Sequence, residues 1–154
     1  MEVKIGRMGF GAIIRDSLGN FCAAKSLSRY GFLSPVAAEA MGALMAIQLC
    51  KDMGFQQIHL EGDARVVVDD VHTMEQNEGG RGLLAEDIRS SLETFSSWKL
   101  EFVRRELNQV AHVLARLASK SNMERVWERE PPDCIREIME LERIALHLGR
   151  EGVG

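Results

Sequence analysis

The chain is poor in cysteine, and the three cysteines that it has are far apart. Cys22, Cys50 and Cys134 form neither the even set of a disulfide framework nor a Cys-x-x-Cys metal motif. They predict reduced thiols, as in an intracellular protein of the cytoplasm or nucleus. Residues 1–6 also lack the apolar core of a secretory signal, so we expect the protein not to be secreted.

Long apolar runs and an excess of positive charge are missing as well. No stretch of about 18 consecutive apolar residues exists, so the sequence predicts no transmembrane helix and no membrane partner. Lys and Arg number 19 against 23 Asp and Glu, which gives a net charge of −4. Strong binding to nucleic acid depends on basic residues that neutralise phosphates. Any such binding here must therefore come from local basic patches or from bound metal ions.

The composition is otherwise that of an ordinary globular protein. Hydrophobic residues make up 45% and charged residues 27% of the 154 residues, which suits one domain with a hydrophobic core. No internal repeat or low-complexity segment interrupts the chain.

The first 28 residues predict two strands joined by a turn. Phe10, Ala12 and Ile14 alternate along residues 8–16, and a second strand is predicted at residues 21–28. The residues between them, Asp-Ser-Leu-Gly-Asn, are typical of a tight turn. Gly9 and Gly11 within the first strand predict either a bulge or a close approach by another part of the backbone.

Helices and strands alternate after this hairpin. Ser34 followed by Pro35 is a signal for the start of a helix, and Gly54 is a signal for its end. Further strands are predicted at residues 57–61 and 98–105. Further helices are predicted at residues 64–75, 84–95 and 109–119. This order predicts a mixed α/β domain over residues 1–120.

Residues 121–154 are expected to form a C-terminal extension with one helix. Pro131 and Pro132 precede that helix, and Ile135, Ile138 and Leu141 lie on one apolar face of it. We expect this face to dock on the preceding domain. The alternative is a surface for a second copy or another partner.

Two acidic residues and their surroundings indicate a family. Glu39 lies in Ala38-Glu39-Ala40 at the start of the first predicted helix, and Asp63 ends Glu61-Gly62-Asp63 after a predicted strand. A glycine-containing hairpin precedes them, and Asn108-Gln109-Val110-Ala111-His112 follows them. In this order, over residues 8–120, the chain resembles the ribonuclease H-like superfamily, in particular the reverse-transcriptase-like ribonuclease H domains of plants. The resemblance implies a mixed sheet flanked by helices.

The resemblance also implies a reaction, the endonucleolytic cleavage of RNA in RNA–DNA hybrids with Mg²⁺ or Mn²⁺ as cofactor. Two divalent ions held by carboxylates can activate a water and neutralise developing charge. Mg²⁺ prefers oxygen ligands. Glu39 and Asp63 match two of the family's four carboxylates, so the resemblance makes them the expected catalytic residues and metal ligands.

The sequence departs from the family at the other two carboxylates. None of residues 1–7 is the Asp of the family's first strand, so we expect that strand to be missing, as in an N-terminally truncated or degenerate copy. His112 stands where the family has its last acid. Neutral imidazole is a poor ligand for Mg²⁺. His112 is therefore either a partly buried helix residue or a residual catalytic contact to metal or phosphate, and we expect hydrolysis to be weak or lost.

Basic and amide side chains near the last predicted strand suit a nucleic acid. Arg104 and Arg105 lie at the end of that strand, where alternation would turn only one of them toward a bound backbone. Asn108 matches the family's Asn before the last helix. Hybrids are recognised through shape, phosphates and 2′-hydroxyls, so these three residues are expected to contact nucleic acid. The alternatives are solvated charge for the arginines and helix capping for Asn108.

Three roles remain open from the sequence. The chain is a weak hybrid nuclease, or a non-catalytic remnant that binds an RNA–DNA hybrid, structured RNA or a protein. The third role is a homo-oligomer, in which another chain pairs with a sheet edge exposed by the missing strand.

Overall fold

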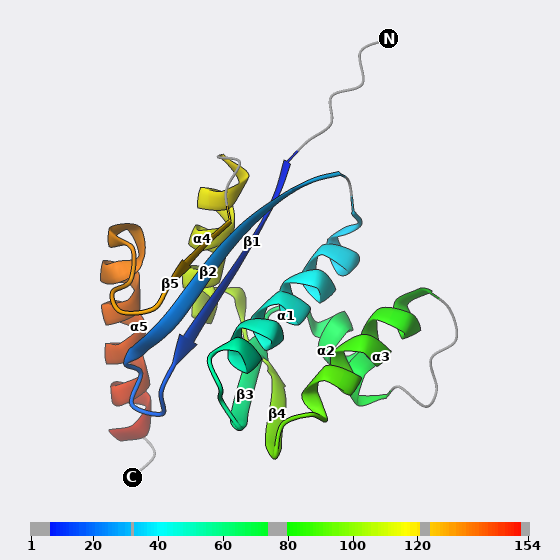
Figure 1. Cartoon of the computed structure of the whole chain (residues 1–154). Helices are drawn as coiled ribbons and strands as arrows, with labels where there is room; N and C mark the ends of the chain where they lie inside the picture. Colours follow the sequence, from blue (N-terminus) through cyan, green and yellow to red (C-terminus); the bar gives the residue numbers. More distant parts are fainter. Residues whose placement is uncertain (1–6, 32, 74–79, 121–123, 152–154) are drawn as a thin grey trace. The chain divides into compact units, whose positions relative to one another are not determined.

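The computed structural model describes residues 7–31, 33–73, 80–120 and 124–151 (Figure 1). It divides into two compact units, which are described separately below. Met1–Met8 and Tyr30–Asn108 form one, the β3–β4 unit. Gly9–Arg29 and Gln109–Gly154 form the other, the hairpin unit. Among the described residues, no helix is both long enough and apolar enough to span a membrane.

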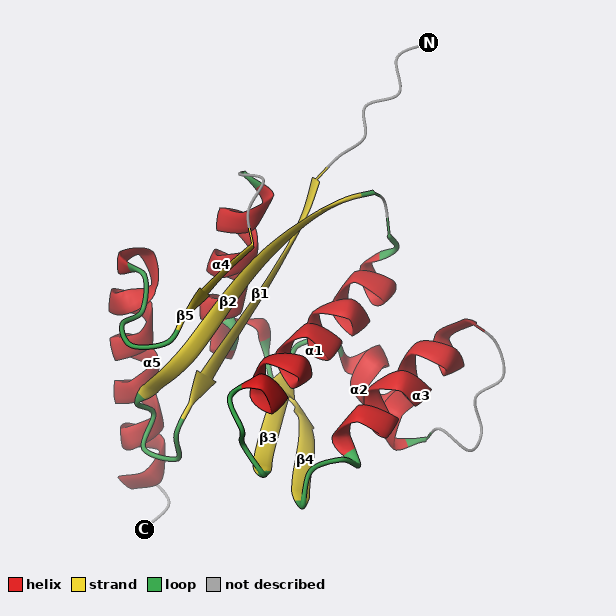
Figure 2. Ribbon diagram, in the orientation of Figure 1, coloured by secondary structure: helices red, strands yellow, loops and turns green. Residues whose placement is uncertain are grey.

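The hairpin unit contains the predicted N-terminal hairpin. β1 (Arg7–Arg15) and β2 (Phe21–Tyr30) are neighbours in a three-stranded sheet of order β1-β2-β5 (Figure 2). Asp16 shapes the turn between them, because its Oδ1 accepts hydrogen bonds from the backbone N–H groups of Leu18 (2.9 Å) and Asn20 (2.8 Å). Gly19, at φ 84°, supplies the left-handed conformation that such a turn needs.

The third strand, β5 (Glu124–Trp127), was not predicted. It pairs antiparallel with β2, with Ala24 opposite Trp127 and Leu27 opposite Glu124. Only four residues long and exposed over its first three, β5 has no clear alternation in its sequence. Its conformation therefore depends on the ladder of hydrogen bonds to β2.

Helices α4 (Gln109–Ser119) and α5 (Asp133–Glu151) complete this unit and pack against each other. Its core consists of Ala24, Val110, Leu114 and Ile135, all fully buried. Ile138 and Met139 of α5 pack against the same cluster, whereas Leu141, which was predicted on the same apolar face, is 61% exposed. The predicted boundary between a domain over residues 1–120 and a C-terminal extension stays a prediction.

The close approach expected at the β1 glycines is confirmed. A Cβ atom added to Gly9 would lie 1.8 Å from the carbonyl oxygen of Ala115, and one added to Gly11 would lie 2.2 Å from that of Ala111. Both distances are far inside van der Waals contact, so only glycine lets β1 and α4 come this close. The buried Ser26 hydroxyl adds a hydrogen bond to the carbonyl of Leu114 (2.9 Å).

The β3–β4 unit is built on two parallel strands and three helices. β3 (Gln57–Gly62) and β4 (Ser97–Phe102) pair in register from Gln57 opposite Ser97 to Gly62 opposite Phe102 (Figure 2). The helices are α1 (Pro35–Asp52), α2 (Arg65–His72) and α3 (Gly80–Leu92). They pack on one another, α1 also contacts β3, and α2 also contacts β4.

Local signals set the limits of α1 as predicted. The Ser34 hydroxyl accepts a hydrogen bond from the N–H of Ala37 (3.2 Å), and Pro35 takes the first helical position. Gly54, at φ 80°, follows the end of the helix. The predicted α/β class is thus confirmed, while the expected absence of a first strand falls on residues 1–6, outside the described part of the chain.

Some predicted boundaries were wrong. The described part of α2 ends at His72, although residues 74–79 lie outside the description, and α3 begins at Gly80, before the predicted residue 84. The strand predicted to reach residue 105 ends at Phe102, and Arg105–Leu107 form a single 3-10 turn. Arg104 and Arg105 therefore do not alternate across a strand. The final ladder bond, from Val103 N–H to the Gly62 carbonyl (2.9 Å), is followed by exposed polar residues that turn away from β3.

Candidate functional site at the carboxyl ends of β3 and β4

Asp63 and Asn108 meet where the two parallel strands end. Asp63 follows the last residue of β3, and Asn108 follows the 3-10 turn after β4. The Asn108 side-chain amide donates a hydrogen bond to Oδ1 of Asp63 at 3.3 Å. Carboxyl ends of parallel strands share one edge of a sheet, and such edges are common ligand sites. The fold thus joins two sequence-predicted site residues that are 45 positions apart.

The bond from Asn108 orients the Asp63 carboxylate. Both residues are half-buried, and the amide fixes the position of one carboxylate oxygen. Metal-binding carboxylates are commonly held by such a second hydrogen bond. Asn108 thus has an observed contact with the candidate metal ligand, and its predicted contact with nucleic acid stays a prediction.

Glu39 belongs to the same unit as Asp63. It lies in the early turns of α1 with an exposed side chain, and α1 packs against β3. An exposed carboxylate on a helix whose start is fixed by Ser34 and Pro35 is accessible to an ion from solvent. Shared binding of one ion by Glu39 and Asp63 stays a prediction.

His112 lies on α4 of the hairpin unit and is half-buried. Its neighbours Val110 and Leu114 are fully buried in the core of that unit. This environment suits the interpretation of His112 as a partly buried helix residue, and a catalytic contact stays a prediction.

Three exposed arginines surround the strand ends that hold Asp63. Arg104 and Arg105 follow β4 after Val103 and are exposed, and their predicted contact with nucleic acid stays a prediction. Arg65, the first residue of α2, was missed by the sequence analysis. Its guanidinium lies 4.6 Å from the centre of the Phe102 ring, a cation–π distance. The sequence offered a single indication of this role, a basic residue two positions after Asp63. These three exposed residues are named the arginine patch, in a chain of net charge −4.

Comparisons with known proteins agree with this architecture. A family model described as reverse transcriptase-like matches residues 1–118. Ribonuclease H1 from the halophilic archaeon Halobacterium salinarum NRC-1 is similar in structure, with a TM-score of 0.54 and 21% identity over 74% of this chain and 96% of that chain. The N-terminal RNase H domain of rv2228c from Mycobacterium tuberculosis has a TM-score of 0.55 and 17% identity over 77% and 95% of the two chains. At these identities the likeness concerns the fold. No curated protein matches the sequence.

Proposed function

The chain belongs to the reverse-transcriptase-like family of the ribonuclease H-like superfamily, and on that basis we propose that it binds RNA–DNA hybrids and slowly hydrolyses their RNA strand. The observation that supports this best is the half-buried Asp63 carboxylate, oriented by Asn108 at the carboxyl ends of two parallel strands.

Glu39 and Asp63 are the proposed ligands of a divalent ion. Both offer carboxylate oxygens, which are the donors that Mg²⁺ and Mn²⁺ prefer. Such an ion, when bound, supplies Lewis-acid stabilisation of a phosphoryl oxygen. The chain's own contribution is to hold the two carboxylates in place, Asp63 through Asn108 and Glu39 through the capped first turn of α1.

The histidine at position 112 is the reason for proposing slow hydrolysis. A neutral imidazole there brings no negative charge to the binding of Mg²⁺. Since each loss of about 1.4 kcal/mol in transition-state stabilisation slows a reaction tenfold, a weakened metal site lowers the rate steeply. A catalytic contact by His112 itself stays a prediction.

Arg65, Arg104 and Arg105 are the proposed contacts to the hybrid backbone. All three are exposed, and they flank the strand ends that hold Asp63 and Asn108. Arginine binds phosphate through paired hydrogen bonds. This patch allows local attraction of a polyanion by a chain whose net charge is negative.

A second candidate is a domain that binds hybrids without cleaving them. It is favoured by His112, which stands in place of an acid. The two candidates share the arginine patch and differ only in whether the remaining carboxylates hold a productive ion.

Cleavage and binding of one labelled RNA–DNA hybrid test both candidates. The wild-type chain is compared in Mg²⁺ and in Mn²⁺ with Asp63→Asn, which keeps the shape and an acceptor for Asn108 but removes the charge. Asp69→Asn, an exposed acid on α2, is the matched control. We expect slow wild-type cleavage, unchanged in Asp69→Asn and lowered by about 100-fold or more in Asp63→Asn, because metal stabilisation supplies several kcal/mol.

Each other outcome has a definite meaning. Equal cleavage by wild type and Asp63→Asn would contradict the metal role of Asp63. Binding without cleavage by all three proteins would select the second candidate. Neither binding nor cleavage would refute the proposed function as a whole.

A further inference from the structure

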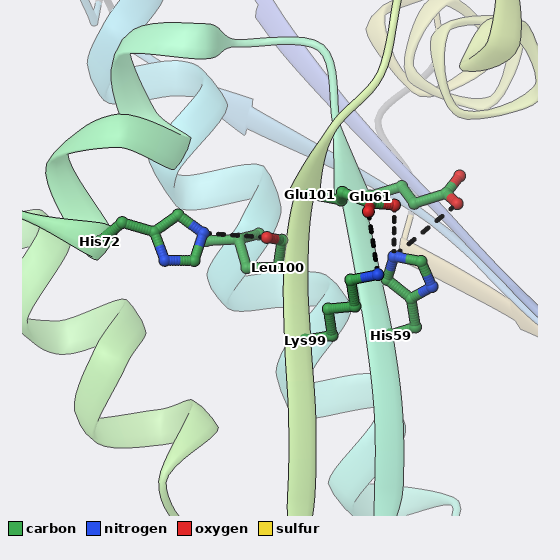
Figure 3. A network of polar contacts seen from close by, with 6 residues as sticks. All are labelled: His59, Glu61, His72, Lys99, Leu100 and Glu101. Carbon is green, nitrogen blue, oxygen red and sulfur yellow. Dashed lines mark hydrogen bonds and ion pairs between the residues drawn. The ribbon is translucent and has the colours of Figure 1, made fainter.

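The outer face of the β3–β4 pair carries a compact group of charged and imidazole side chains. His59 and Glu61 lie two residues apart on β3, and Lys99 and Glu101 lie two residues apart on β4. Residues at this spacing share one face of a strand. The parallel register sets His59 opposite Lys99 and Glu61 opposite Glu101, so all four gather in one place (Figure 3).

Three of these side chains bring metal-binding atoms together. His59 Nε2 lies 3.0 Å from Oε2 of Glu101 and 4.0 Å from Oε1 of Glu61. All three ligand atoms lie within 4.8 Å of one another. A tetrahedral ion with bonds of about 2.0–2.2 Å holds its ligand atoms about 3.3–3.6 Å apart. Small rotations of the two long glutamate side chains would bring the three ligand atoms to these separations.

We propose that His59, Glu61 and Glu101 form a surface site for a divalent transition-metal ion, with Zn²⁺ as the best match. An imidazole with two carboxylates suits Zn²⁺, whereas Mg²⁺ and Ca²⁺ take oxygen ligands alone. Three protein ligands leave one tetrahedral position for water. The site uses none of the residues assigned above to hybrid cleavage, so it does not rest on the proposed function.

Lys99 already pairs with the Glu101 carboxylate and so competes with the ion for it. Its Nζ lies 3.0 Å from Oε1 of Glu101, while the imidazole of His59 is nearest to Oε2 of the same carboxylate. The two oxygens thus have separate partners (Figure 3). An ion that replaces the hydrogen bond between His59 and Oε2 can leave the ion pair with Lys99 intact. The side chains of His59, Glu61 and Glu101 are 42%, 48% and 45% exposed, which gives an ion direct access from solvent.

Binding of this ion would join β3 to β4 across the parallel pair. Glu61 is two residues before Asp63, and Glu101 is followed by Phe102, whose ring lies under Arg65. A ligand that binds the folded state alone stabilises it. The ion would therefore stiffen the strand ends on which Asp63 and Arg65 are placed.

Zn²⁺ titration of the full chain by calorimetry tests the site. The variants are His59→Gln and Glu101→Gln. The carboxylate control is Glu93→Gln, an exposed residue directly after α3 that pairs with Arg89. We expect a Zn²⁺ site whose dissociation constant rises at least about tenfold in each ligand variant and stays unchanged in Glu93→Gln and in Asp63→Asn.

A second measurement on the wild-type chain identifies the ligand directly. Zn²⁺ should shift the imidazole proton NMR signals of His59. The internal control is His72, whose Nε2 lies 2.9 Å from the Leu100 carbonyl on another side of β4 (Figure 3). Unmoved His59 signals, or equal Zn²⁺ affinity in wild type and His59→Gln, would overturn the proposal and leave the cluster as an ion-pair network. Loss of hybrid cleavage with retained Zn²⁺ binding would affect only the proposed function.

Discussion

Replacing Gly11 by alanine should destabilise the protein strongly, because the added methyl group would push β1 and α4 apart. The added Cβ would lie 2.2 Å from the Ala111 carbonyl oxygen, 2.7 Å from the Ala115 nitrogen and 2.7 Å from Cβ of Leu114. Two of these three atoms belong to the backbone of α4. A side-chain rotation therefore cannot relieve the clash, and the helix itself must move away from β1.

The size of the effect follows from how firmly α4 is held. Ordinary van der Waals contact begins near 3.4 Å, so α4 would have to retreat by about 1 Å. Val110 and Leu114 are fully buried, and Ser26 donates a hydrogen bond to the Leu114 carbonyl. Overpacking of a core costs about 1–3 kcal/mol, and a backbone clash of this depth belongs at the upper end. At about 2–4 °C per kcal/mol for a chain of this length, the melting temperature should fall by about 6–12 °C.

Thermal unfolding followed by circular dichroism measures this effect, with Gly62→Ala as the matched control. Gly62 is the last residue of β3, and a Cβ there would meet nothing within 4 Å. Gly62→Ala should therefore be close to neutral, or slightly stabilising because alanine restricts the unfolded chain. Equal melting temperatures for Gly11→Ala and wild type would refute the close approach of β1 and α4.

Two further predictions concern the arginine patch and the cysteines. Arg104→Ala combined with Arg105→Ala should weaken hybrid binding at low salt and reduce the slope of log affinity against log salt by up to about 2, which a gel-shift series measures; an unchanged slope would exclude both arginines as phosphate contacts. Burial raises the pKa of the Cys50 thiol from 9.0 to about 11, whereas Cys134 is exposed. The Cys50 thiol therefore stays protonated to a higher pH in the folded chain than in the unfolded chain. Its contribution to the free energy of unfolding is fully present below pH 9.0 and is lost as the pH rises toward about 11. At pH 8, a thiol reagent should modify Cys134 quickly and Cys50 only after unfolding; rapid native modification of Cys50 would contradict its burial.

Local patterns in the sequence predicted much of the secondary structure. Ser34, Pro35 and Gly54 mark the limits of α1 because a cap, a first-turn proline and a left-handed glycine each act within a few residues. The turn at Asp16 is likewise made by one side chain bonding to its own neighbours. Glu39 and Asp63, in their surroundings, indicated the family that the comparison over residues 1–118 shows.

The same patterns failed where a distant partner decides the structure. β5 exists because β2 pairs with it, and β4 ends at Phe102 because its partner β3 ends at Gly62. Neither limit is visible in the periodicity of the strand itself, since the pairing strand is about 40 or more residues away. For this reason Arg104 and Arg105 were wrongly assigned to a strand.

The candidate sites show the same division between sequence and structure. The resemblance to the family indicated Asp63 and Asn108 as candidate site residues from residue types and order. Their hydrogen bond, and the meeting of His59 with Glu101, required the parallel pairing of β3 and β4. The sequence determines which donors and charges are available, and the tertiary structure decides which of them come within reach of one another, because chain topology and not sequence distance sets their separation.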